Sequence, residues 1–312
     1  MKARPYHAVL GMLAVLAVTP APSRAQQDAA PVQAAPPSRQ TPVEGRDYRV
    51  YTRDGAATSL AAIFEAMDPA EVVLVGEEHG DTVGHRLEAA LLTGALERYR
   101  GTPRWVMLSL EMFERDVQYV LDEYLTGLIA EAHFLDSARP WEEYAMRYRP
   151  LVETARAWRI PVVAANAPRR YVNRVTREGP GSLADLGPLA KHYLPPLPYP
   201  GPSDRYRAQW DALMSGQDHG VDLGENALQA QALWDASMGH AVVEALGRGP
   251  DRFVIHVAGS FHVERGTGVP ERIEDLRPGT RIVSVVMRRT DSPAAWDPEA
   301  HTDLGDFVIL TR

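Results

Sequence analysis

Two short histidine motifs carry the chemistry most visible in this chain. Gly76-Glu-Glu-His79 and Gly259-Ser-Phe-His262 each place a histidine three residues after a glycine. Imidazole changes its protonation near neutral pH and is a common metal ligand, so both motifs suit acid–base catalysis or metal binding. Each motif follows a short apolar run, Val72 to Val75 in the first case and Phe253 to Ala258 in the second, which is typical of a buried strand.

A carboxylate joins these histidines if the strands belong to one sheet. Polar residues just past strand ends lie where open α/β sheets place their ligand crevice. Glu111 ends the apolar run Trp105 to Leu110 and falls on the same edge. We therefore expect Glu77, His79, Glu111 and His262 to line one pocket as candidate catalytic residues. Because the chain has no cysteine, any metal site must use histidine, aspartate, glutamate or tyrosine, and His79 and His262 are the candidate ligands if a metal is bound.

Other polar side chains are candidate ligand contacts. Asn166 and Arg169 follow a third predicted strand, and a guanidinium beside a crevice suits a carboxylate or phosphate. Gln231 and Asp235 are four residues apart on one face of a predicted long helix. The full candidate ligand-binding set is His85, Asn166, Arg169, Tyr193, Tyr206, His219, Gln231 and Asp235.

Each candidate also has a purely structural explanation. Carboxylates favour helix N-termini, so Glu77 and Glu78 suit a strand-to-helix turn without any catalytic role. Glu111 suits a helix cap, His262 suits a hydrogen-bonded structural histidine, and Arg169 suits a solvated loop. The residue types alone leave these alternatives open.

The elements that position these residues alternate between strand and helix. Apolar runs predict strands, and helical spacing of apolar residues predicts helices between them. This order predicts an α/β fold with a largely parallel or mixed central sheet flanked by helices. The predicted strands cover residues 71–76, 105–110, 160–166, 253–258, 280–288 and 307–310, and the predicted helices cover residues 85–99, 116–128, 149–158 and 225–246.

A helical and loop insertion interrupts this pattern at residues 168–224. The segment is rich in proline, glycine, tyrosine and arginine, and its stretch from Tyr193 to Pro202 excludes regular helix and central strand. We expect one or two short helices here. The whole of residues 46–312 is expected to form one α/β domain.

The N-terminus predicts export. Lys2 and Arg4 precede the apolar stretch Ala8 to Val18, and small residues stand at Ser23 and Ala25. This pattern indicates a signal peptide at residues 1–25, cleaved near Ala25, and a location in the periplasm or outside the cell. Residues 26–45 have the composition of a disordered linker. No other segment reaches the length of a membrane-spanning helix.

The composition excludes some partners. The formal net charge is −8, and it becomes −11 once Lys2, Arg4 and Arg24 leave with the signal peptide. An acidic chain gains nothing from a phosphate backbone, so we expect no nucleic-acid partner. A homodimer is left open.

Several motifs together resemble the ChaN-like haem-binding uptake family, which belongs to a wider group with the Tiki and TraB proteins and the erythromycin esterases. The match runs in order over residues 70–290 and is specific as a set. One departure is Gly-Ser-Phe-His in the second motif, where the family often has a second glycine before the histidine. The segments that carry the resemblance are Gly76-Glu-Glu-His79 with His85, Leu110-Glu-Met-Phe-Glu-Arg-Asp116, Tyr148-Arg-Pro-Leu151, Ile160-Pro-Val-Val-Ala-Ala-Asn166-Ala-Pro-Arg169, Ala230-Gln-Ala-Leu-Trp-Asp-Ala-Ser-Met238, and Gly259-Ser-Phe-His262 with Gly268-Val-Pro270.

The resemblance implies two functions. The first is a secreted haem-binding protein in iron or haem uptake, with haem as cofactor and ligand. The second is a hydrolase that uses the paired Gly-x-x-His motifs and a glutamate, with or without a divalent metal. A non-catalytic partner-binding role is the third alternative. The family's usual lipid-anchored cysteine is missing, which argues against a lipid anchor but not against export. Haem needs an apolar slot, an axial histidine or tyrosine, and cations for its propionates.

Overall fold

The computed structural model describes residues 41–215 and 224–312, and an 8-stranded sheet runs through this part of the chain. The strand order is β2-β1-β8-β7-β3-β6-β4-β5. From β8 to β5 every neighbouring pair is parallel, whereas β1 is antiparallel to both β2 and β8. The predicted α/β class with a mixed, largely parallel sheet is therefore confirmed. The strands are β1 (Tyr48–Thr52), β2 (Ala57–Thr58), β3 (Val72–Glu77), β4 (Trp105–Glu114), β5 (Val162–Asn166), β6 (Arg252–Gly259), β7 (Ile282–Arg289) and β8 (Phe307–Thr311).

Helices fill the connections between these strands. Short 3-10 turns lie at Arg115–Val117, Pro180–Asp185, Ser260–His262 (η4) and Glu264–Gly266 (η5). The α-helices of the described residues are α1 (Leu60–Met67), α2 (Thr82–Arg98), α3 (Gln118–Leu125), α4 (Glu131–Ala138), α5 (Tyr144–Arg147), α6 (Arg149–Trp158), α7 (Arg169–Glu178), α8 (Pro188–His192), α9 (Asp204–Ser215), α10 (Gly224–Leu246), α11 (Val269–Leu276) and α12 (Pro298–His301).

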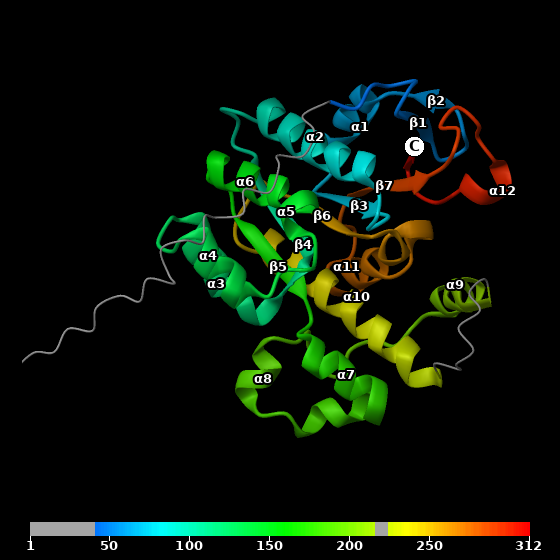
Figure 1. Ribbon diagram of the computed structural model, residues 1–312. Coiled ribbons are helices and arrows are strands. Elements are labelled where there is room, and N and C mark those ends of the chain that lie inside the picture. Colours follow the sequence, from blue (N-terminus) through cyan, green and yellow to red (C-terminus); the bar gives the residue numbers. More distant parts are fainter. Residues whose placement is uncertain (1–40, 216–223) are drawn as a thin grey trace, which may run out of the picture. The chain divides into compact units, whose positions relative to one another are not determined.

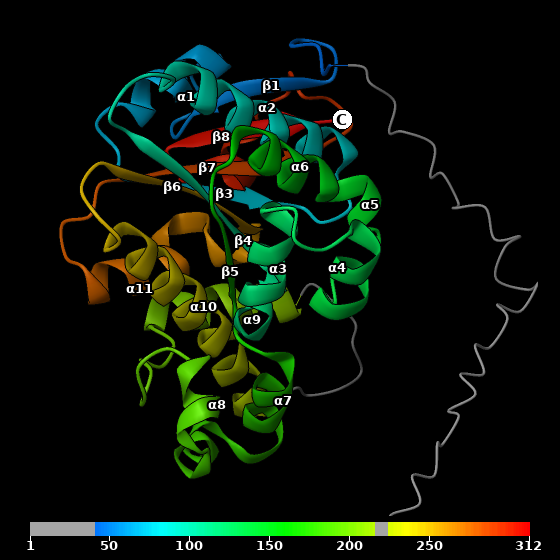
Figure 2. The ribbon, with the colours of Figure 1, turned by 90° about the vertical axis from the view of Figure 1, so that its left-hand side faces the viewer.

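Both faces of the sheet are covered, as the apolar composition of its central strands requires. All six residues of β3 are buried, and its side chains alternate between two cores. Val73 and Val75 pack on the side of α2 and α6, whereas Val72 and Leu74 pack on the side of α10 and α11. Figures 1 and 2 show α2 and α6 on one side of the sheet and α10 and α11 on the other.

The register of β3 and β6 brings the two histidine motifs together. These strands are parallel neighbours, with Gly76 opposite Ala258 and Glu77 opposite Gly259. Both strands therefore end at the same level of the same sheet edge. The loops that follow them start side by side although the two motifs are far apart in sequence.

Two predicted boundaries are wrong in informative ways. The helix expected from residue 85 begins at Thr82, because the Asp81 carboxylate accepts a 2.9 Å hydrogen bond from the Val83 N–H and caps it. The strand expected to end at Leu110 continues to Glu114, with an irregular register towards β5 between Leu110 and Glu114. Glu111 thus lies inside β4 at a bulge and not after the strand.

The insertion contains more helix than expected. Within its described residues it holds α7, α8 and α9, where one or two short helices were predicted. Val172, Val175 and Leu183 of this segment pack against Leu233 and Ala236 of α10. Apolar residues spaced along α7 supply that contact, but proline and glycine in the same stretch hid the pattern.

The predicted signal peptide and most of the predicted linker lie outside the described residues. In residues 41–215 and 224–312, no helix is long and apolar enough to cross a membrane.

Candidate functional site

Two glycines allow the motifs to approach each other. A Cβ on Gly76 would lie 3.0 Å from the Ser260 Cα, so only glycine lets η4 pack against the end of β3. A Cβ on Gly259 would lie 3.0 Å from Nε2 of His79 and 3.6 Å from Oε2 of Glu111. The first residue of each Gly-x-x-His motif is therefore dictated by the close contact between the two motifs.

The first motif forms a carboxylate–imidazole pair. Nδ1 of His79 lies 2.6 Å from Oε1 of Glu77, and the hydroxyl of Tyr148 donates to the same oxygen at 2.7 Å. Trp141 packs edge-on against the His79 ring, with ring centroids 5.0 Å apart. The Glu77 carboxylate is buried, but 45% of the His79 side chain is exposed. The Glu77 carboxylate thus orients an imidazole ring that is partly exposed to solvent.

A buried polar layer supports this pair. His85 forms a 3.0 Å ion pair with Glu77 through Nδ1, and its Nε2 lies 3.0 Å from the carbonyl oxygen of His79. Burial lowers the pKa of His85, but its bonds to Glu77 and Glu88 outweigh burial and raise it to about 10. Burial and the nearby charge of Glu77 raise the pKa of Glu88. His85, predicted as a ligand contact, therefore lies beneath the site and holds Glu77 in place.

The second motif forms a matching pair. Nδ1 of His262 lies 2.8 Å from Oδ1 of Asp235, and the hydroxyl of Tyr206 donates to the other Asp235 oxygen at 2.5 Å. Asp235 comes from α10 and Tyr206 from α9. All three side chains are buried. Asp235 and Tyr206, both predicted as ligand contacts, therefore orient His262.

Glu111 lies between the two pairs. Its Oε2 accepts a 2.7 Å hydrogen bond from the Gly259 N–H, and its Oε1 lies 3.8 Å from Nε2 of His262. The close approach of His79 to Gly259 places the first imidazole beside the same carboxylate. The structure thus brings Glu77, His79, Glu111 and His262 into one cluster at the sheet edge.

The charges of the cluster set the protonation of its histidines. Burial lowers the pKa of His262, but the carboxylates of Asp235 and Glu111 more than offset burial and raise it to about 9. Burial also lowers the pKa of His79, and here Glu77 and Glu111 produce a net increase. Burial raises the pKa of Glu77, yet its bonds to His79 and His85 bring it below its usual range. At neutral pH His262 is therefore an imidazolium facing a carboxylate, suited to donate a proton.

Beneath the two motif histidines, three other side chains lie close enough together to share a metal ion. Among the described residues, the group with ligand atoms within 4.8 Å of one another is Glu77, His85 and Glu88. Its members are buried and already bonded to each other. This group fits a shared-proton network better than an open coordination sphere, since the His85 Nδ1 that a metal needs is engaged by both carboxylates.

The remaining predicted ligand contacts lie elsewhere. Asn166 is buried at the end of β5 and bonds the Ala167 N–H, and Arg169 is exposed at the start of α7. Gln231 has a buried side-chain oxygen without a hydrogen bond within the described chain. Tyr193 lines a cavity beside His192, and His219 lies outside the described residues. No contact in the described part of the chain joins Asn166 or Arg169 to the two histidines.

Sequence reasoning gave no role to several residues that build the cluster. Tyr148 was part of a quoted motif, but nothing in its spacing tied it to a glutamate 71 residues earlier. Glu88 was detectable, because it follows His85 by three positions on a helix and so shares its face. Trp141 had no signal in the sequence.

The comparisons with known proteins agree with this architecture. A family model described as "Haem-binding uptake, Tiki superfamily, ChaN" matches residues 63–273. No curated protein matches the chain. Among solved structures, the chain is similar to ChaN of Campylobacter jejuni, described as binding haem cofacially, at 16% identity and a TM-score of 0.64 over 87% of this chain and 100% of that one.

More distant likeness extends to two other structures. One is an erythromycin esterase mutant in its open conformation, at 11% identity and a TM-score of 0.44, over 85% of this chain and 82% of that chain. The other is a Bacillus cereus protein at 12% identity and a TM-score of 0.42, over 74% of this chain and 70% of that chain. The family match spans most of the domain that carries both histidine motifs, and the chain belongs to the haem-binding uptake family of the Tiki superfamily, ChaN.

Proposed function

We propose that this protein binds haem and takes part in haem or iron uptake outside the cytoplasm. The observation that carries the proposal is family membership, together with a fold that matches the whole length of a ChaN protein described as haem-binding. The predicted signal peptide supports the location.

A cavity in the insertion suits the cofactor. Its volume is about 770 Å³, within the range of roughly 300–1,000 Å³ usual for cofactor sites. Prolines from the stretch after α8, with Leu183 and Leu194, give it apolar walls. Lys191, His192 and Tyr199 also line it, so it offers one cation for a propionate and two side-chain types that serve as axial ligands. Haem, when bound, supplies the iron chemistry, and these residues hold it.

Hemin titration followed by the Soret band tests the proposal. The wild-type protein should show a saturable Soret shift. His192→Ala and Tyr199→Phe should weaken or reshape it, whereas His79→Ala and His262→Ala should leave it largely intact. His133→Ala, an exposed histidine on α4, is the matched control. If the wild type shows no saturable shift, haem binding is rejected. Loss of the shift in both motif variants would place the haem on the motif histidines.

A second candidate function is hydrolysis at the motif cluster. The favouring observation is the pair of carboxylate-oriented imidazoles whose Nε2 atoms lie near Glu111. His79 is the accessible member and suits a general base for water. His262, protonated at neutral pH, suits the general acid. A divalent ion held by His79 and His262 would serve the same reaction class, and metal analysis of protein purified without chelator checks it.

Hydrolysis of p-nitrophenyl acetate measures this second function. His79→Ala and His262→Ala should each lower kcat/KM by roughly 10² to 10⁴, the usual contribution of one positioned acid or base. His133→Ala should leave the rate unchanged. Equal rates in all four proteins would assign the turnover to something other than this cluster.

A further inference from the structure

A second cavity opens directly beside the motif cluster. Its volume is about 760 Å³, and it lies between α9, the η4 and η5 turns, and the end of β7. Glu78 lines it and immediately precedes His79, and Ser260 and Phe261 line it just before His262. Both Gly-x-x-His motifs therefore border this cavity, which is distinct from the one proposed for haem.

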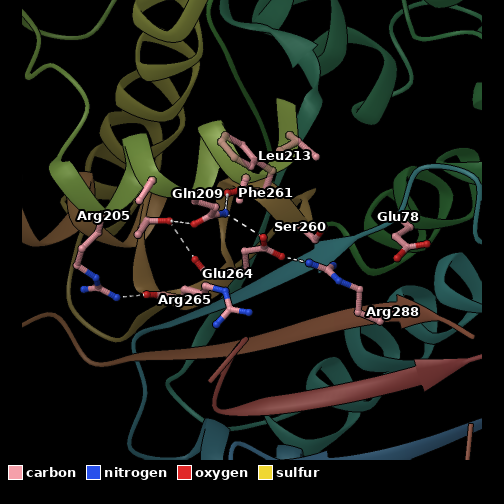
Figure 3. Close-up of a pocket in the computed structure, with 12 residues that line it drawn as sticks. Glu78, Arg205, Gln209, Leu213, Ser260, Phe261, Glu264, Arg265 and Arg288 are labelled. Carbon is pink, nitrogen blue, oxygen red and sulfur yellow. Dashed lines mark hydrogen bonds and ion pairs between the residues drawn. The ribbon is translucent and has the colours of Figure 1, made fainter. Parts of the chain in front are cut away.

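One wall of the cavity is apolar. Ala208, Ala212 and Leu213 lie on one face of α9 and are exposed, so apolar side chains face the opening. Phe261 joins them and is fixed by edge-on contacts with Tyr206 and Trp210, at centroid distances of 5.1 and 6.0 Å. Figure 3 shows Leu213 and Phe261 on one side of the cavity, with Arg265 and Arg288 away from them.

Arg205, Arg265 and Arg288 also line the cavity, and Arg205 comes from the same helix as the apolar residues. Arg288 is ion-paired with Glu264, which also accepts a 2.9 Å hydrogen bond from Gln209. Arg205 and Arg265 differ, because neither has a carboxylate partner within residues 41–215 and 224–312. Arg205 donates to the carbonyl oxygen of Arg265, and Arg265 donates to that of Thr302 at 3.4 Å.

The surroundings of these two arginines leave their charges uncompensated by the local backbone. Arg205 occupies the first turn of α9, where the helix dipole disfavours a cation. Arg265 has φ of 57°, in the left-handed region that side chains seldom adopt, and its N–H is held by the carbonyl oxygen of Leu304 at 2.8 Å. The chain as a whole is acidic, so its average field repels anions. Two guanidinium groups without a carboxylate partner in the described residues make this cavity locally positive beside its apolar side chains.

We propose that this cavity binds a small amphipathic carboxylate. The apolar body lies along α9 and Phe261, and the carboxylate is held by Arg205 and Arg265, whose planar guanidinium groups match it bidentately. A long-chain monocarboxylate and the propionate edge of haem share this chemistry. The proposal concerns a cavity that the haem proposal does not use and therefore stands independently of it.

The fluorescent fatty acid dansylaminoundecanoic acid and its methyl ester test the proposal, since they differ only in the charged group. The wild-type protein should bind the acid more tightly than the ester. The double variant Arg205→Gln, Arg265→Gln should bind the acid at least about tenfold more weakly, as for loss of a charge-assisted bond, and the ester unchanged. Added salt should weaken acid binding in the wild type but not in the variant.

A matched control lies on the same helix. Arg207→Gln removes the same charge from α9, but Arg207 pairs with Glu225 and does not line the cavity. It should bind the acid like the wild type. An equal loss of affinity for the acid in this control would show that net charge alone causes the effect and would overturn the proposal. A wild-type protein that binds the acid no better than the ester, or not at all, would also overturn it.

Hemin competition distinguishes the two sources of carboxylate. Displacement of the acid by hemin but not by hemin dimethyl ester assigns the cavity to the haem propionates. Displacement by oleate alone assigns it to a monocarboxylate, and either result supports the proposal. A protein that binds the acid but gives no Soret shift fails the haem proposal and leaves this one standing.

Discussion

Gly259 leaves room for the His79 imidazole beside Glu111. A substitution that adds one methyl group at this position tests whether that room is needed. Gly259→Ala would place a Cβ 3.0 Å from the ring, so the ring must turn away from Glu111. We expect His79 to lose part of the pKa increase that Glu111 provides, and any esterase activity to fall at least about tenfold. NMR titration of the His79 ring measures the pKa change and does not depend on an activity assay.

Gly181→Ala is the control for this variant, because a Cβ there meets nothing within 4 Å. It should change neither the titration nor the activity. An unaltered His79 titration in Gly259→Ala would show that the contact does not orient the ring.

The sequence identified the residues able to do chemistry better than the residues that orient them. His79 and His262 were recognisable because each follows a strand, and Glu111 was recognisable because it follows an apolar run, although it lies inside β4. Tyr148 and Tyr206 were not assigned as carboxylate partners, because such contacts join residues brought together only by the folded chain. Asp235 was recognisable as a polar residue on an otherwise buried helix face, but its partner was not.

Among the elements, α2 carries the first motif's supporting residues and begins at a buried cap. Asp81 accepts from the Val83 N–H at 2.9 Å and from the Thr311 hydroxyl at 2.5 Å, which ties the helix to the end of β8. Asp81→Ala removes both bonds, so we expect a loss of about 2–3 kcal/mol in the free energy of unfolding. Urea denaturation measures it.

Asp297→Ala is the matched control at a second helix. Asp297 caps the short, exposed α12 through a 2.9 Å bond from the Glu299 N–H. Its loss should cost about 1 kcal/mol or less. Equal effects at the two caps would mean that the Thr311 contact adds nothing.

The elements themselves were largely predictable where apolar periodicity is strong, and boundaries failed where a local device overrides it. The bulge in β4 extends the strand through Glu111 to Glu114, a change that alternation alone does not encode. The antiparallel pair β1 and β2 was missed because Tyr48–Thr52 mixes polar and apolar residues next to a low-complexity segment.

Across the whole molecule, buried histidines give folding stability a pH optimum. His256 is buried in β6, and burial together with the charge of His262 lowers its pKa to about 3. Below about pH 6.5 the unfolded chain binds a proton there that the folded chain does not. Stability therefore falls as pH drops from 6.5 towards 3, by up to about 1.4 kcal/mol per pH unit for one proton.

His262 acts in the opposite direction, since its folded-state pKa is raised to about 9. Its contribution is fully present below about pH 6.5 and is lost as pH rises through 9. We measure the urea midpoint of unfolding between about pH 4 and about pH 10. Its dependence on pH should weaken on the acid side in His256→Asn and on the alkaline side in His262→Asn. His133→Asn should follow the wild type, and parallel curves for all four would exclude these two groups as the titrating residues.

The position of β6 has a consequence for the order in which the molecule is made. β6 inserts between β3 and β4, which the ribosome delivers far earlier, so these two strands have no pairing with each other to form. Until residues 252–259 emerge, β3 and β4 present unpaired apolar edges, and the contacts that close the sheet span much of the chain. A polypeptide halted before Arg252 lacks both its central pairing and His262. Pairing of the central strands and assembly of the histidine cluster are therefore both late events in the synthesis of this chain.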